Sequence, residues 1–151
     1  RVGAGFTAEL GSMAVTEQID AIRALGADPV RKLVLPRVIA MVIAIPLLTI
    51  LADLVGCFGG AVVTMLEVGV TWKFSVDQML ETIWVSDLVH GLAKSCFLGY
   101  IIAIIGCWNG MRTHGGTEGV GRATTNTVVY TSISILVADF ILTRFLMAVY
   151  A

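Results

Sequence analysis

The run from Val38 to Leu66 contains a single charged side chain, Asp53. About 20 apolar residues suffice for a helix to cross the ~30 Å hydrocarbon core of a bilayer, and this run is longer. Because the hydrocarbon core offers no water to the backbone, each N–H and C=O must bond within the protein, which favours a helix. The run therefore predicts a transmembrane helix, with Pro46 as a tolerated kink within it.

Two further apolar runs resemble the first in length, and each carries ionisable side chains. Lys94 lies in the earlier run, and Asp139 and Arg144 lie in the later one. Across the chain 14% of residues are charged and 57% are hydrophobic, whereas soluble domains carry about 25% charged residues. We expect an all-α polytopic integral membrane protein with three visible transmembrane helices at 38–66, 88–108 and 126–150.

The distribution of basic residues predicts the orientation. Half of the ten Lys and Arg residues lie at or before Arg37, ahead of the first span. The connection 109–125 also carries Arg112 and Arg122, so both segments are expected on the cytoplasmic side. The acid-rich segment 67–87 is then outside, where Ser75 is predicted to cap a short surface helix that ends at Trp84.

The segment from Thr16 to Asp28 is predicted to form a short amphipathic helix followed by a sharp corner. Thr16 is a typical N-cap, and Gly26 stands where a left-handed residue ends a helix. Asp28 followed by Pro29 is typical of the start of the next helix. Between these signals lie a polar set and an apolar stripe at three-residue steps: Glu17, Asp20 and Arg23, and Ile19, Ile22 and Leu25.

The string TEQIDAIRALGADPVRKLVLPR, which begins at Thr16, closely resembles the signature of the MlaE-type permeases. These are membrane subunits of ABC transporters that move phospholipid or related lipids. The strings GGTEGVGRATTNTVVYTS, from Gly115, and ADFILT, from Ala138, resemble the same family. The resemblance implies that 16–28 is a coupling helix, which docks into a groove on the ATPase subunit.

The same resemblance implies partners and a location. It implies a permease homodimer, ATPase subunits that hold ATP and Mg²⁺, an MCE-domain protein and a phospholipid substrate, in the bacterial inner membrane. This chain itself is expected to hold no cofactor. Members of the family have further helices before the signature, so we expect residues 1–10 to end a preceding span and the chain to be a C-terminal fragment.

Four ionisable side chains are predicted at bilayer depth: Asp53, Lys94, Asp139 and Arg144. Such a group costs roughly 2.5–3.5 kcal/mol on insertion scales, so it usually faces a bundle interior or a wet cavity. One interpretation is that acids and bases form ion pairs that fix helix register, and we expect an acid of this set to pair with a base. The other is contact with a lipid headgroup or a gating role, and the sequence leaves both open.

Several other functions lack their usual signals. A net charge of −1 disfavours a nucleic-acid partner, and neither CxxC, HExxH nor GxSxG occurs, so we assign no metal ligand and no catalytic residue. The glycine-rich stretch after Gly115 lacks GxxxxGK[ST], so it predicts a flexible or tightly turned connection and not a nucleotide site.

Two alternatives belong to other classes of protein. Asp53 and Asp139 within the membrane would suit an ion-coupled secondary transporter or a channel, although no inverted repeat is evident. A lipid-modifying enzyme would need a nucleophile or metal constellation that the sequence lacks.

Gly56 and Gly60 form a GxxxG pair, which predicts either a close helix contact or ordinary glycines of a span.

Overall fold

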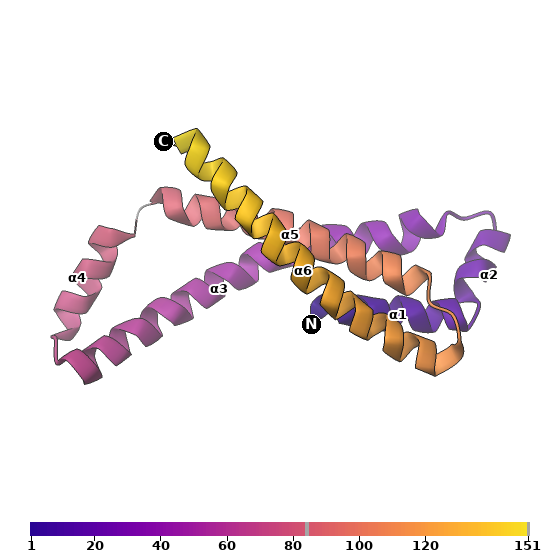
Figure 1. Ribbon diagram of the computed structural model, residues 1–151, viewed down its shortest axis with the longest axis horizontal. Helices are drawn as coiled ribbons and strands as arrows, with labels where there is room; N and C mark the ends of the chain where they lie inside the picture. The colour runs from indigo at the N-terminus through magenta and orange to yellow at the C-terminus, as the bar shows by residue number, and fades with distance from the viewer. Residues whose placement is uncertain (84, 151) are drawn as a thin grey trace.

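The computed structural model describes residues 1–83 and 85–150, and all regular structure in these ranges is helical (Figure 1). Three stretches are long and apolar enough to cross a membrane, namely Val30–Val68, Ser86–Met111 and Gly116–Ala148. The predicted all-α polytopic fold class is confirmed. The helices are α1 (Val2–Val15), α2 (Gln18–Ala24), the π-helical turn η1 (Val30–Val34), α3 (Leu35–Val68), α4 (Trp72–Thr82), α5 (Val85–Met111) and α6 (Gly116–Tyr150).

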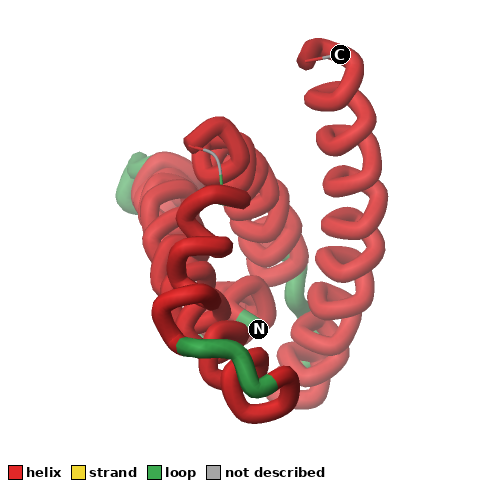
Figure 2. Tube along the Cα trace, turned by 90° about the vertical axis from the view of Figure 1, so that its left-hand side faces the viewer, coloured by secondary structure: helices red, strands yellow, loops and turns green. Residues whose placement is uncertain are grey.

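Helix α5 is the central element, because it packs against α1, α3 and α6. Helices α1 and α6 also contact each other, so α1, α5 and α6 form a three-helix group. Helix α3 packs against α5 of this group. The C-terminal end of α6 extends away from the other helices (Figure 2). The buried apolar side chains Leu10, Met41 and Cys107 come from α1, α3 and α5, which places the core among these helices.

The outward faces of the long helices are apolar. On α3 the side chains of Leu54, Val55 and Phe58 are mostly exposed, and on α6 those of Leu136 and Phe140 are too. Monomeric soluble proteins rarely expose contiguous apolar surface of this extent. These faces therefore suit contact with lipid or with another membrane subunit.

The connections lie at two opposite ends of the molecule. Helix α2 and the α5–α6 turn are at one end, and α4 with the α3–α4 turn is at the other (Figure 1). Helix α2 with the turn η1 that follows it, and the α5–α6 turn, therefore share an end, whereas the N-terminus lies nearer the middle of the molecule (Figure 1). This arrangement agrees with the orientation predicted from the charges.

The predicted cap of the outer helix is wrong. Ser75 lies inside α4 and is buried, while the helix begins at Trp72 after the extended residue Thr71. The left-handed Gly69 (φ 73°) ends α3, and the Trp72 ring packs edge-on against Phe58 at 5.8 Å between centroids. Because the chain reverses direction at Gly69, α4 begins at Trp72, before Ser75 is reached. The predicted end at Trp84 lies outside the described residues.

The glycine-rich connection is shorter than predicted. Helix α5 continues to Met111 and α6 already begins at Gly116, so most of 109–125 is helical. Gly115 and Gly116 take φ values of 90° and 70°, which glycine adopts without steric cost and which allow an abrupt reversal. Glu118 and Arg122 then form an i,i+4 ion pair of 2.6 Å that supports the first turns of α6.

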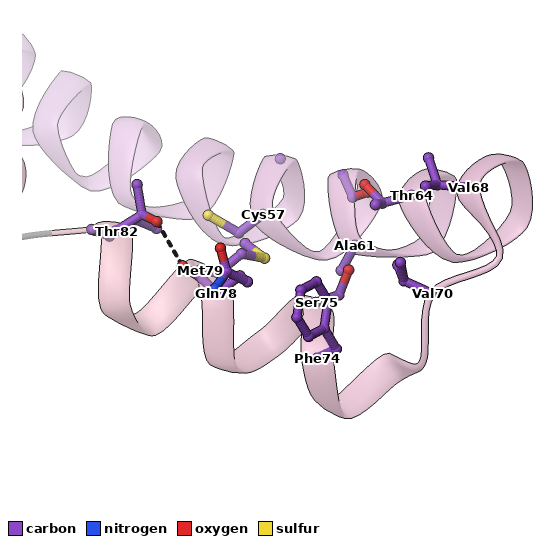
Figure 3. A pocket seen from close by; sticks show the side chains of 13 residues that line it. Cys57, Ala61, Thr64, Val68, Val70, Phe74, Ser75, Gln78, Met79 and Thr82 are labelled. Atoms are coloured by element: carbon purple, nitrogen blue, oxygen red, sulfur yellow. Dashed lines mark hydrogen bonds between the residues drawn. The ribbon is translucent and has the colours of Figure 1, made fainter.

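A groove runs between the C-terminal part of α3 and α4. It has a volume of about 640 Å³, and its lining includes Gly56, Gly60, Ala61, Phe74 and Met79. Figure 3 shows the side chains of the two helices facing each other across it. Apart from the adjacent turns of α3 itself, a Cβ added at Gly56 or Gly60 would meet no described atom within 4 Å. Within this chain the GxxxG pair therefore makes no close helix contact.

The orientation predicts a labelling pattern. In a background without the native cysteines, a cysteine at Asp77 on α4 should react with a membrane-impermeant maleimide added from outside. A cysteine at the exposed Thr117, at the opposite end of the molecule, should react only after the membrane is opened. Labelling of the Asp77 position solely from the cytoplasmic side would contradict the predicted orientation. Helix α2 would then lie on the outer side, where it could not meet a cytoplasmic ATPase.

Candidate functional site

Helix α2 ends in the glycine-dependent corner that the sequence predicts. Gly26 takes a left-handed φ of 75°. Its N–H donates to the carbonyl of Arg23 at 2.9 Å, and the N–H of Ala27 donates to that of Ile22 at 3.2 Å. These two bonds make a Schellman motif, which satisfies carbonyls at the helix end. A side chain at Gly26 would be strained in this conformation.

Asp28 starts the next helical segment, also as predicted. Its Oδ1 accepts a hydrogen bond from the N–H of Val30 at 2.9 Å, and Pro29 between them adopts helical backbone angles. An aspartate at this position satisfies a backbone donor that the first turn would otherwise leave free. The corner thus fixes the direction in which the chain leaves α2.

The start of α2 differs from the prediction, because Thr16 does not cap it. The Thr16 hydroxyl donates to the carbonyl of Ser12 at 2.9 Å, so Thr16 belongs to the end of α1. Glu17 is the residue before α2 and takes a left-handed φ of 58°, which is uncommon for a residue with a side chain. Since the Thr16 hydroxyl is occupied within α1, it has no role in starting α2.

The polar residues of α2 lie on its exposed side. Arg23 Nη1 is 3.1 Å from Asp20 Oδ1, and both side chains are more than half exposed, so they share one face as their spacing predicts. Glu17 is exposed as well. A cleft of about 340 Å³ separates these residues from His114 and Gly115 in the α5–α6 turn. The polar face of α2 and this turn thus border one surface.

The apolar stripe of α2 divides between the interior and the surface. Ile19 is 4% exposed and Leu25 is 85% exposed, while Ile22 is intermediate. Helix α2 packs against α1, so Ile19 is used to hold α2 onto the rest of the chain. Leu25 is therefore the apolar side chain of this stripe that α2 exposes most fully.

Two of the four predicted intramembrane charges lie together. Lys94 Nζ on α5 is 3.6 Å from Asp139 Oδ1 on α6, and it donates a hydrogen bond to the Thr143 hydroxyl at 2.7 Å. The prediction that an acid of this set pairs with a base is confirmed. Asp53 and Arg144 are exposed. No residue in the described part of the chain forms a hydrogen bond or an ion pair with either side chain.

A buried polar cluster joins α1, α5 and α6, and the sequence interpretation missed it. The Thr7 hydroxyl is 2.9 Å from the Gly106 carbonyl, to which it donates, and 2.9 Å from the Thr127 hydroxyl. Asn109 Nδ2 donates to the Thr127 hydroxyl at 3.0 Å. A signal was available, because Gly3, Thr7 and Gly11 recur every four residues and so do Gly106 and Gly110, a spacing typical of close membrane-helix contacts.

Comparisons with known proteins agree with the motifs. The model of the family "Permease MlaE" matches residues 1–145. A probable ABC transporter permease protein of Rickettsia typhi is 42% identical over 152 residues, which cover 99% of this chain and 58% of the relative. The intermembrane phospholipid transport system permease protein MlaE of Haemophilus influenzae is 37% identical over 150 residues, covering 95% of this chain and 55% of that protein.

A plant protein is similar as well. The chloroplastic protein TRIGALACTOSYLDIACYLGLYCEROL 1 of Arabidopsis thaliana is 41% identical over 145 residues, or 96% of this chain and 41% of the relative. The chain spans about half the length of the curated relatives it matches. Since the family model covers nearly the whole chain, and the helical architecture agrees with the matched motifs, the chain belongs to the MlaE permease family.

Proposed function

We propose that this chain is part of the permease subunit of an ABC transporter that moves phospholipids or related lipids. The observation that carries the proposal is the exposed polar face of α2, held by defined corners between two longer helices in a chain of the MlaE permease family. A short helix fixed on both sides transmits displacement to its neighbours. It therefore suits a coupling helix that docks on an ATPase subunit.

The division of labour follows from this role. ATP and Mg²⁺ would be held by the ATPase subunit, and this chain would convert closure of that subunit into movement of its spans. The exposed apolar faces of α3 and α6 suit a second copy of the permease and the acyl chains of the substrate. The relative from Haemophilus influenzae is named for intermembrane phospholipid transport, which supports a location in the bacterial inner membrane and an MCE-domain partner outside it.

An ion-coupled transporter or channel is the alternative, and exposed Asp53 at bilayer depth is the observation that favours it. Purification of the full permease from its native membrane distinguishes the two. Recovery of an ATPase subunit, with lipid movement that requires ATP hydrolysis, supports the proposal. Transport driven by an ion gradient without an ATPase would support the alternative.

Reversal of charges on α2 gives a sharper test. The variants are Asp20→Arg, Arg23→Glu and the two combined. Each single change breaks the 3.1 Å ion pair, whereas the double change restores a pair on the helix but inverts the charges that a partner meets. We expect all three to weaken ATPase association, since truncation of an interface hot spot costs ~2 kcal/mol or more, which is about a thirtyfold loss of affinity.

The control is Lys73→Glu, an exposed charge reversal on α4 at the opposite end of the molecule. It should leave ATPase copurification unchanged, and all variants should insert in the membrane. Recovery of association in the double variant alone would mean that the pair only stabilises α2. Normal association and transport in all three variants would contradict the coupling role and would mean that α2 is a solvated connector.

A further inference from the structure

Arg37, at the start of α3, is 15% exposed in its side chain and is held by two contacts. Its Nη2 lies 2.8 Å from Glu9 Oε1 on α1. Its Nη1 donates a hydrogen bond to the carbonyl of Leu33 at 2.9 Å. A guanidinium presents several donors in a fixed plane, so it can hold two acceptors at once in a way that an ammonium group cannot. Arg37 therefore binds its own helix start and a second helix together.

The helix start that Arg37 holds is irregular. Val30–Val34 forms a π-helical turn, in which the N–H of Leu35 bonds to the carbonyl of Val30, five residues back. The following residue, Pro36, has no N–H to donate. The junction between α2 and α3 is thus wider than an α-helix and has one backbone donor fewer. Leu33, whose carbonyl receives the Arg37 guanidinium, lies within this turn.

Glu9 lies on α1, the helix that precedes α2, and Arg37 lies on the helix that follows it. Figure 1 shows the end of α1 and the beginning of α3 both leading to α2 at one end of the molecule. The ion pair therefore closes a loop of chain that contains the whole of α2 and its corner. Without it, a displacement of α2 could be absorbed by the π-helical junction and would reach α3 only in part.

We propose that Glu9 and Arg37 are a positioning pair for energy coupling, which stiffens the junction after α2 and makes α1 and α3 move together. The inference rests on the proposed function and adds to it the residues that carry displacement from α2 to the spans. The pair contacts neither lipid nor nucleotide in this role. It sets how much of the movement of α2 becomes movement of α3.

The experiment uses the full permease with its ATPase subunit in phosphatidylethanolamine–phosphatidylglycerol vesicles, with fluorescently labelled phosphatidylethanolamine as the probe. The variants are Glu9→Gln, Arg37→Ala and Arg37→Lys, and the quantity measured is labelled lipid moved per ATP hydrolysed. We expect Glu9→Gln and Arg37→Ala to keep ATP hydrolysis within about twofold while the ratio falls roughly tenfold. A lysine in Arg37→Lys can keep one of the two contacts but cannot hold both acceptors at once. The ratio of lipid moved to ATP hydrolysed for this variant should therefore lie between that of the unaltered protein and that of Arg37→Ala.

Arg31→Ala is the matched control, because Arg31 is an exposed arginine of the same π-helical turn and should leave the ratio unchanged. If the Arg37→Ala permease does not assemble, the Glu9→Gln variant alone tests the inference. This variant changes only one exposed carboxylate, so it should still assemble. An unchanged ratio in Glu9→Gln, or hydrolysis and transport that fall together, would overturn the inference. Absence of ATP-dependent lipid movement in the unaltered protein would instead overturn the proposed function.

Discussion

Replacement of Gly106 by valine is expected to separate α1 from α5 and to destabilise the fold by roughly 3 kcal/mol or more, the upper end of what overpacking a core costs. A Cβ at this position would lie 2.8 Å from the carbonyl oxygen of Gly3 and 3.3 Å from its Cα. Both are backbone atoms, which cannot rotate away as the end of a side chain can. The measurement is the midpoint of thermal unfolding in detergent, followed by circular dichroism.

Gly59→Val is the matched control for this change. Gly59 is also a glycine inside a membrane-spanning helix, but apart from the adjacent turns of α3 a Cβ there would meet no described atom within 4 Å. The helix-propensity difference between glycine and valine is common to both variants, so the difference between them reports the close approach of α1 and α5. Equal midpoints for the two variants would show that α1 does not pack on Gly106.

Reversal of Asp139 to lysine is expected to abolish the proposed lipid transport, because it would place two ammonium groups together between α5 and α6. In the unaltered chain Lys94 Nζ and Asp139 Oδ1 are 3.6 Å apart. An unpaired charge at bilayer depth costs roughly 2.5–3.5 kcal/mol, and breaking one partner of a pair is more costly than removing both. ATP-dependent movement of labelled phospholipid and the yield of assembled complex are the measurements.

The double variant Lys94→Asp with Asp139→Lys tests whether pairing is the role of these residues. It should recover part of the yield and of the transport that each single reversal loses, although the 2.7 Å contact of Lys94 with Thr143 is not restored. Arg144→Ala is the control, since Arg144 is exposed on the same helix. No recovery in the double variant would favour direct contact with a lipid headgroup, the interpretation that the sequence leaves open.

Local chemistry explains what could be predicted without the structure. The long apolar runs predict helices because a bilayer leaves the backbone no other partner. The corner after α2 was predictable because Gly26 and Asp28 act through bonds to residues only a few positions away. The strings that resemble the MlaE-type permeases are likewise contiguous, so they identified the family before any geometry was known.

The same local reasoning failed where the limits of a helix depend on the segment that precedes it. Thr16 and Ser75 are both good N-cap residues by type, yet neither begins a helix here. The Thr16 hydroxyl bonds back into α1, and Ser75 lies inside a helix that starts earlier because the chain reverses at Gly69. Residue type alone does not show whether an N-cap residue begins a helix, because the start of a helix depends on where the preceding helix ends.

By itself, the sequence determined the helical class, the membrane-spanning lengths, the corner between α2 and α3 and the family. Only the tertiary structure decided that Lys94 pairs with Asp139, that Ile19 is turned inward, and that Thr7 meets Thr127 from 120 positions away. The physical reason is that these contacts depend on how helices approach each other. That approach is set by small residues such as Gly106, whose missing side chain lets two backbones come close.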